Sequence, residues 1–397
     1  MQVRPITQAE HERAQHVKST AFLRVSQDIS PEDTSWRQIR AAFDDDGTMM
    51  SCVHDMPFVS QLNGRMVGMC GIGGVASLPE YRRRGSIRAI MQHILDDAYA
   101  RGDVLSTLYP FSFAYYRKFG YEVAQAINAV TIPMSQMAHY APFGTARAFA
   151  AGDDLAPFQA VYAQFIKGRN LACDRDDAQT GRPLWHSWLG SKFVPGKIRE
   201  YAYLWRDTDG TPGAYALVCP QGQGDDTAFE VYDYAFVSPR AFRGLMGFLR
   251  LLDGQASSIR IRLPEDMAPH TLFPQPYDIT VSGQPRGMVR LVHVEKALHT
   301  LAAPGLTGEV VLGVQDDMLP QNSGAWLLSL EDGHAYVQKT DKASAFNLNI
   351  GLLSQLVCGT LSFEQATYLH DFSLDEEQTA FLTRVFPKRK QLLIERF

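Results

Sequence analysis

The sequence has few cysteines and no long apolar segment. Its cysteines are odd in number and widely spaced, which is typical of reduced thiols rather than of a disulfide framework or a zinc site; they are Cys52, Cys70, Cys173, Cys219 and Cys358. No apolar run approaches the roughly 18 residues that cross a membrane, and the N-terminal stretch MQVRPITQAEHERA lacks the apolar core of a signal peptide. We therefore expect a cytoplasmic protein that does not bind membranes.

Charge and short motifs exclude further classes. The formal net charge of −5 lacks the basic excess of a general nucleic-acid binder, so we expect no nucleic-acid partner. The 11 histidines show no spacing suited to zinc, and we expect no metal. The motifs Gly-x-Ser-x-Gly, Walker loop and Gly-x-Gly-x-x-Gly are also absent. With 45% hydrophobic and 20% charged residues among 397, the composition predicts a soluble globular protein of more than one domain.

An arginine-rich turn precedes a strongly patterned helix in the stretch LPEYRRRGSIRAIM, residues 78–91. Arg82, Arg83 and Arg84 lie where the positive end of the helix dipole disfavours cations. Unpaired backbone N–H groups at a helix N-terminus bind phosphate, Gly85 allows close approach of the backbone, and arginines add charge-assisted hydrogen bonds. The turn therefore predicts a site for an anion such as pyrophosphate. The alternative is a solvated basic turn.

The elements around this turn follow a defined order. Asn63-Gly64 predicts a hairpin, and its second strand contains the run GIGG, whose glycines permit a bulge or a close ligand approach. After the turn, apolar residues at i, i+3 and i+4 spacing predict a helix, followed by the strand DVLSTLYP, a short helix around FAYYRKFG and the strand YEVAQAINAVTIPM. Tyr115 and Tyr116 lie on adjacent faces of the short helix, so one can face the core and the other a cleft. The simpler alternative is that both are core residues.

From about residue 146 the order of elements begins again. The run FEVYDYAFVSPRAFRGLMGFLRLL parallels GIGGVASLPEYRRRGSIRAIM, because both combine a strand, a basic turn, a glycine and an apolar helix. However, Pro239 to Gly244 is one residue shorter than Pro79 to Gly85, and it carries Arg240 and Arg243 in place of three consecutive arginines. We interpret this region as a duplicated domain whose second copy has lost its loop.

Taken together, VASLPEYRRRGSIRAIM and the later YYRKFGY resemble the GCN5-related N-acetyltransferase (GNAT) superfamily. The length, the duplication and the terminal Phe397 make the chain most similar to the enhanced intracellular survival (Eis) family. The resemblance implies two tandem GNAT folds, with mixed and mostly antiparallel sheets flanked by helices, and then a sterol-carrier-protein-like α+β domain. The expected domains are a catalytic one at 1–145, a degenerate one at 146–288 and the C-terminal one at 289–397. It also implies a homohexamer.

The resemblance further implies roles for particular residues. Tyr116 takes the role of general acid, and the α-carboxylate of Phe397 that of general base. The residues implied to bind acetyl-CoA are Val75, Ala76, Ser77, Arg83, Arg84, Gly85, Ser86, Ile87, Arg88, Phe111 and Ser112. Two positions depart from the pattern. Ile87 stands where the superfamily often has glycine or alanine, and Arg396 stands where aminoglycoside-acetylating members have an acidic residue.

The implied activity is acetyl-CoA-dependent N-acetylation, by direct transfer to a primary amine of a small molecule or peptide. In this mechanism Phe397 accepts the amine proton, a strand amide near Val75 or Ala76 polarises the acetyl carbonyl, and Tyr116 protonates the departing thiolate. The sequence names no acceptor, and Arg396 puts aminoglycosides in doubt. Two alternatives stay open: a non-catalytic acetyl-CoA sensor, and a lipid carrier that works through the C-terminal module.

Overall fold

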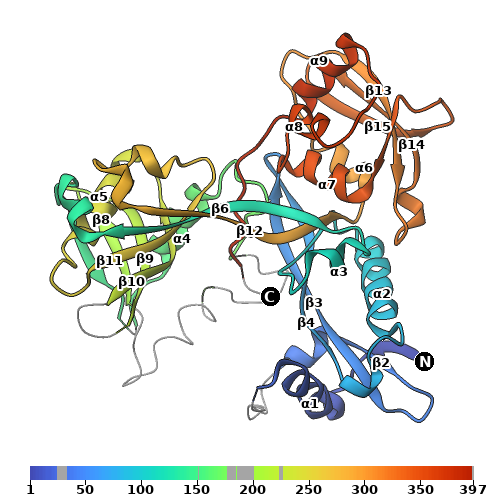
Figure 1. The fold of residues 1–397 in the computed structure, drawn as a ribbon, viewed down its shortest axis with the longest axis horizontal. Coiled ribbons are helices and arrows are strands. Elements are labelled where there is room, and N and C mark those ends of the chain that lie inside the picture. The colour runs from blue at the N-terminus through green and yellow to red at the C-terminus, as the bar shows by residue number, and fades with distance from the viewer. Residues whose placement is uncertain (25–33, 151, 177–184, 186–200, 223–226, 396–397) are drawn as a thin grey trace. The chain divides into compact units, whose positions relative to one another are not determined.

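The computed structural model describes residues 1–24, 34–150, 152–176, 185, 201–222 and 227–395. The chain divides into two compact units. The first comprises Met1–Gln125 and Arg286–Arg389 together with Glu395, and the second comprises Ala126–Pro285 and Lys390–Ile394. The boundaries fall within two strands, β6 (Glu122–Pro133) and β12 (Thr280–Leu291) (Figure 1). Each unit is therefore assembled from segments that lie far apart in the sequence.

The N-terminal half of the first unit is a sheet with helices on both faces. Its strands run in the order β1-β2-β3-β4-β5, followed by the end of β12. Their bounds are β1 (Gln2–Pro5), β2 (Ile39–Phe43), β3 (Met49–Leu62), β4 (Arg65–Ser77) and β5 (Leu105–Leu108), and the helices are α1 (His11–Phe22), α2 (Ser86–Arg101) and α3 (Phe113–Arg117). On β2, Ala41 packs in the cluster that contains α1, whereas Ala42 packs in the cluster that contains α2. Because successive side chains of a strand point to opposite faces, α1 and α2 cover opposite faces of the sheet.

Several local predictions are confirmed in this half. Asn63 and Gly64 connect β3 to β4 with φ of 50° and 83°, the left-handed values of a tight hairpin turn. The predicted helix after the arginine turn is α2, whose buried face includes Ile90 and Ile94. All five cysteines of the chain are buried thiols, and burial raises the pKa of Cys52 to about 12.

The C-terminal half of the first unit is a four-stranded sheet with short helices, as expected of a small α+β module. The strands lie in the order β15-β14-β13-β16. Their bounds are β13 (Gly308–Gln315), β14 (Gly324–Glu331), β15 (His334–Thr340) and β16 (Phe346–Asn349), and the helices are α6 (Val294–Leu298), α7 (Ile350–Cys358), α8 (Phe363–Thr367) and α9 (Glu376–Val385). Strand β16 runs parallel to β13, while β13, β14 and β15 form an antiparallel meander.

The second unit is a sheet with the order β6-β11-β10-β9-β8-β7. Its further elements are β7 (Thr145–Ala148), α4 (Ala156–Phe165), β8 (Tyr201–Arg206), β9 (Pro212–Gln221), β10 (Ala228–Phe236), α5 (Pro239–Arg250) and β11 (Ser258–Pro264). Trp205 is buried in its core, and its indole N–H donates to the carbonyl of Phe143 at 2.9 Å. The succession of β10 and α5 repeats that of β4 and α2. Among the helices of the described residues, none is long and apolar enough to cross a membrane.

Candidate functional site

The candidate site is built around a bulge in β4. The pairing register of β3 with β4 shifts between Cys52 and His54, so that β4 carries one extra residue there. Gly74 lies in the bulge with φ of 54°, and a Cβ at this position would lie 3.2 Å from the His54 ring. A glycine therefore allows the strand to bulge against β3. The bulge agrees with the prediction from the GIGG run.

Beyond the bulge, β4 separates from its parallel neighbour. Within the described residues, β4 pairs with β5 only over Met69–Ile72. The segment 73–77 therefore presents backbone N–H and C=O groups that β5 does not pair. An unpaired strand edge of this kind can hydrogen-bond an extended ligand that contains amide groups. Val75, Ala76 and Ser77 lie in this segment.

The arginine turn that follows β4 has a defined shape. Arg83 and Gly85 both adopt left-handed backbone conformations, with φ of 63° and 83°. Gly85 is the N-cap of α2 and brings no side chain to cover the first turn of the helix. The backbone N–H groups of Ser86, Ile87 and Arg88 have no acceptor among the described residues. Unpaired amides at the start of a long helix are the donors that bind a phosphate group.

A buried serine that the sequence analysis did not single out holds this turn in place. Ser51 on β3 is fully buried, and its Oγ lies 2.6 Å from the Oγ of Ser77 and 2.7 Å from the Oγ of Ser86. These two partners are the last residue of β4 and the first residue of α2. Ser51 therefore ties both ends of the arginine turn to the neighbouring strand.

Replacing Ser51 by alanine is expected to lower the free energy of unfolding by about 1–3 kcal/mol, because a buried Ser86 hydroxyl loses a partner. The acetyl-CoA KM should rise about threefold, because the turn loses its attachment. Urea unfolding and steady-state kinetics measure the two effects. The matched control is Ser60→Ala on the same strand, since the Ser60 hydroxyl is buried without a partner among the described residues. Equal effects of both substitutions would contradict the role of Ser51.

A cavity of about 700 Å³ is lined by residues of the β4 bulge, the arginine turn and α3. Because α3 carries Tyr115 and Tyr116, we call it the tyrosine helix. The predicted ligand-binding residues that line the cavity are Val75, Ala76, Ser77, Arg83, Gly85, Ser86, Ile87, Arg88 and Phe111. The other two predicted residues do not line it. Arg84 lies over the Tyr81 ring at 5.0 Å, and the Ser112 hydroxyl accepts the Tyr115 N–H as the N-cap of α3.

The two tyrosines of α3 have different environments. Tyr115 is half-buried and lines the cavity, whereas Tyr116 is 2% exposed and packs edge-on against Phe111 and Tyr115, with ring centroids 5.5 Å and 5.2 Å away. Tyr116 therefore contacts two residues of the cavity wall. Burial raises the pKa of both phenols, and more strongly that of Tyr116. A raised pKa keeps a phenol protonated, and hence a proton donor, at neutral pH.

The cavity has further lining residues that were not among those implied to bind acetyl-CoA. Arg82 and Lys118 line the cavity beside Arg83 and Arg88, and the described lining contains no acidic side chain. Phe119, just beyond α3, also lines the cavity, and Ala21 and Phe22 at the end of α1 complete the wall. The run of three arginines indicated that Arg82 could contact an anion. No local pattern marks a residue such as Phe22, which reaches the site through tertiary packing.

Among the described residues of the second unit, no equivalent of the arginine turn precedes α5. Helix α5 begins at Pro239 and is capped by Ser238, whose hydroxyl accepts the Ala241 N–H. Arg240 is paired with Asp207 at 2.6 Å. Gly244 lies inside α5, where a Cβ would lie 2.1 Å from the Trp205 ring, so it packs the core and does not precede the helix as Gly85 does. The predicted loss of the loop in the second copy agrees with this arrangement.

The predicted general base, Phe397, and the neighbouring Arg396 lie outside the described residues. The preceding segment is docked in the second unit. The Asn170 N–H donates to the Lys390 carbonyl at 2.8 Å, and the Leu392 N–H donates to the Asn170 carbonyl at 2.9 Å. No cluster of three or more metal-binding side chains occurs in the part of the chain that the structure describes.

Family models match most of the chain. Residues 2–124 and 175–291 each match an acetyltransferase (GNAT) domain, and residues 294–394 match a sterol carrier protein domain. These matches confirm the predicted fold class of two GNAT domains and a sterol-carrier-type domain. A GNAT fold implies acetyl-CoA binding.

Known proteins similar to this chain are N-acetyltransferases. An uncharacterized N-acetyltransferase of Streptomyces coelicolor is 27% identical over 75% of this chain and 72% of its own length. The N-acetyltransferase Eis of Mycobacterium tuberculosis is 26% identical over 73% of this chain and 70% of its own length. The fold matches that of Eis1 from Mycobacterium abscessus, with a TM-score of 0.83 at 21% identity over the whole of both chains. From these relatives, the domain matches and the site geometry, we conclude that the chain is an Eis-like N-acetyltransferase of the GCN5-related superfamily.

Proposed function

We propose that the protein transfers the acetyl group of acetyl-CoA to a primary amine, by direct attack in a ternary complex at the cavity of the first unit. The observation that carries this proposal is that one cavity joins an unpaired strand edge, an uncapped helix N-terminus and a tyrosine helix. These three features match, in turn, the pantetheine arm, the pyrophosphate and the thioester of acetyl-CoA. The catalytic domain would span 1–145, the degenerate copy 146–288 and the sterol-carrier-type domain 289–397.

The residues present fit acetyl-CoA. The amides of Ser86, Ile87 and Arg88 supply hydrogen bonds for a pyrophosphate, and the exposed arginines of the turn supply positive charge. The unpaired segment of β4 matches the amide groups of a pantetheine arm, and Phe111 adds an apolar surface. The cavity volume of about 700 Å³ lies in the range of small-molecule and cofactor sites.

In the proposed mechanism a backbone N–H near Val75 or Ala76 stabilises the negative charge that develops on the acetyl oxygen. Tyr116 donates its proton to the departing thiolate. Its contact with Phe111 and Tyr115 supports this role, because both line the cavity. Much of the acceleration comes from holding the amine beside the thioester.

We propose the α-carboxylate of Phe397 as the base that accepts the amine proton, on the family resemblance alone. A carboxylate has a lower pKa than an ammonium, so the base must be partly buried or the amine must arrive neutral. Appending two residues after Phe397 tests this role: we expect turnover to be lost and acetyl-CoA binding to be kept. Two residues appended before Met1 are the control, and full activity of the C-terminal variant would exclude the role.

The acceptor that we propose is a primary amine of a small molecule or peptide, and the Eis resemblance supports a cytoplasmic homohexamer. The function is tested by measuring CoA thiol release from acetyl-CoA over a panel of polyamines, aminoglycosides, amino acids and lysine peptides. We expect release that depends on one class of amine. Acetyl-CoA binding without release for any amine would favour a non-catalytic sensor instead.

A further inference from the structure

A buried ion pair in the first unit contacts the residue segment that directly follows the tyrosine helix. Arg290 on β12 and Asp316, which follows β13, both have side chains closed to solvent, and Nη2 of Arg290 lies 2.5 Å from Oδ2 of Asp316. Burying two charges is unfavourable unless further hydrogen bonds satisfy the groups. The partners of each side chain therefore show what the pair holds together.

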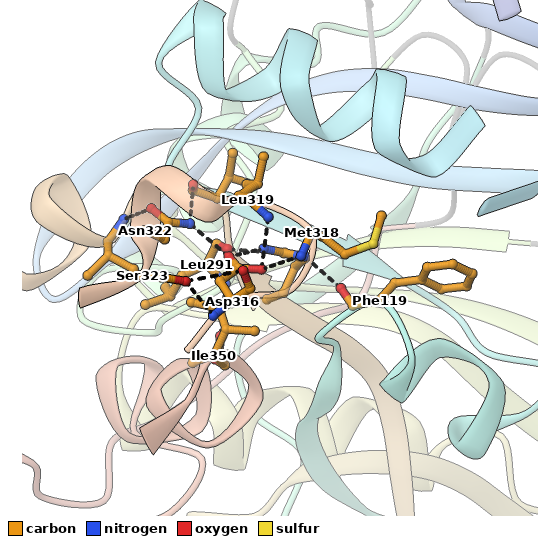
Figure 2. A network of polar contacts seen from close by, with 12 residues as sticks. Phe119, Leu291, Asp316, Met318, Leu319, Asn322, Ser323 and Ile350 are labelled. Atoms are coloured by element: carbon orange, nitrogen blue, oxygen red, sulfur yellow. Dashed lines mark hydrogen bonds and ion pairs between the residues drawn. The ribbon is translucent and has the colours of Figure 1, made fainter. Parts of the chain in front are cut away.

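The C-terminal half of the unit holds Asp316. Its Oδ1 accepts the backbone N–H groups of Met318 and Leu319 at 3.0 Å and 3.1 Å, and its Oδ2 also accepts the Asn322 side-chain amide at 2.9 Å (Figure 2). A carboxylate with this many donors is fixed in position. Asp316 thus presents a rigid acceptor to Arg290.

Arg290 connects this acceptor to the end of the tyrosine helix. Its Nη1 donates to the Phe119 carbonyl at 2.6 Å, just beyond the C-terminus of α3 (Figure 2). The N–H of Phe119 in turn donates to the Tyr116 carbonyl at 2.9 Å, and the N–H of Tyr121 donates to the same carbonyl at 3.3 Å. The turn that carries Tyr116 is therefore tied to Arg290. A cation at a helix C-terminus is also favoured by the helix dipole.

We propose that Arg290 is a positioning residue for acetyl transfer, which fixes the tyrosine helix against the C-terminal half of the unit through Asp316. The inference rests on the proposed function of Tyr116. The hydrogen bonds of Arg290 go to Phe119, Leu291 and Asp316, none of which belongs to the arginine turn. Loss of the guanidinium shifts Tyr116 relative to the thioester sulfur and leaves the phosphate-binding turn in place. Phe119 also lines the cavity, so we expect the main effect on kcat and less than a twofold change in the acetyl-CoA KM.

Arg290→Lys is the first test, because one ammonium keeps the charge but does not reproduce the fork that spans two acceptors. We expect kcat to fall about tenfold, since a small misplacement near the chemistry is costly, with the acetyl-CoA KM changed less than twofold. The matched control is Arg175→Lys in the second unit, where the Arg175 and Asp233 side chains are both buried and pair at 2.8 Å. The control should keep its kcat.

A second variant tests the same role in case Arg290→Lys fails to fold. Arg290→Met combined with Asp316→Asn removes both charges together, so that neither is left buried alone, and the asparagine keeps an oxygen for the Met318 and Leu319 amides. Circular dichroism and thermal melting establish that the variant is folded. A folded variant of either kind with unchanged kcat, or with a raised acetyl-CoA KM and unchanged kcat, overturns the inference.

The decisive measurement is a double-mutant cycle with Tyr116→Phe. If Arg290 acts through Tyr116, then Arg290→Lys should lower kcat in the wild type and lower it no further in Tyr116→Phe. Independent, multiplicative losses would overturn the positioning role and leave the acid role of Tyr116 standing. If Tyr116→Phe alone leaves kcat unchanged, both the acid role and the positioning role fail. The two failures are thus distinguished.

Discussion

Tyr116→Phe is expected to lower kcat about 100-fold, the lower end of what a general acid contributes, and to leave the acetyl-CoA KM within about twofold. Only the hydroxyl is removed, so the ring still packs against Phe111 and Tyr115 and the cavity wall keeps its shape. Within the described residues the hydroxyl has no hydrogen-bond partner, and its loss therefore leaves no structural donor or acceptor unpaired. Steady-state kinetics with saturating amine separate the two parameters.

The pH profile adds a second check on Tyr116. Burial raises its pKa above that of an ordinary phenol, so the hydroxyl keeps its proton to a higher pH than a free tyrosine does. We therefore expect no alkaline loss of kcat from this group below about pH 10. Tyr99→Phe, near the C-terminal end of α2 where Tyr99 stacks on His293, is the control and should be fully active. A large loss in Tyr115→Phe with none in Tyr116→Phe would transfer the acid role to Tyr115.

Reversing the charge of the turn, with Arg82→Glu and Arg83→Glu together, is expected to raise the acetyl-CoA KM about 100-fold, because each reversal beside a pyrophosphate is worth roughly tenfold. Both side chains line the cavity, and both lie in an exposed turn, so folding should not depend on them. At saturating acetyl-CoA, kcat should change less than about threefold, since the helix amides and Tyr116 are untouched.

The same variant should show a salt dependence opposite to that of the wild type. The KM of the wild type should rise with ionic strength, because salt screens attraction at an exposed site, and the KM of the variant should fall. Arg240→Glu with Arg243→Glu, at the corresponding helix of the second unit, changes the net charge equally and is the matched control. A similar KM increase in this control would show that the effect is one of overall charge and not of the turn.

Short sequence patterns correctly predicted the secondary-structure elements that surround the cavity. The hairpin at Asn63-Gly64, the helix after the arginine turn and the bulge in the GIGG run each depend on residues within a few positions of one another. Their backbone preferences and apolar spacing are readable without any partner. The missing loop of the second copy was likewise predicted from a short local difference in sequence. The position of Gly244 inside α5 was not predicted, because it depends on contact with Trp205.

Family resemblance and tertiary structure supplied the rest. The roles proposed for Tyr116 and Phe397 come from the family resemblance, since a tyrosine in an aromatic segment has no local mark of catalysis. That Arg82 and not Arg84 faces the cavity depends on the left-handed turn and on the stacking of Arg84 over Tyr81. No local pattern marks such a difference between adjacent arginines.

Local sequence was thus sufficient for the arginine turn, the bulged strand and the order of elements, because these arise from interactions between near neighbours in the chain. The tertiary structure decided which side chains meet. Ser51 reaches Ser77 and Ser86 across strands, and Arg290 reaches Phe119 from 171 positions away. Such contacts are set by the packing of distant segments, and buried polar groups must find their partners there, whatever their sequence neighbours are.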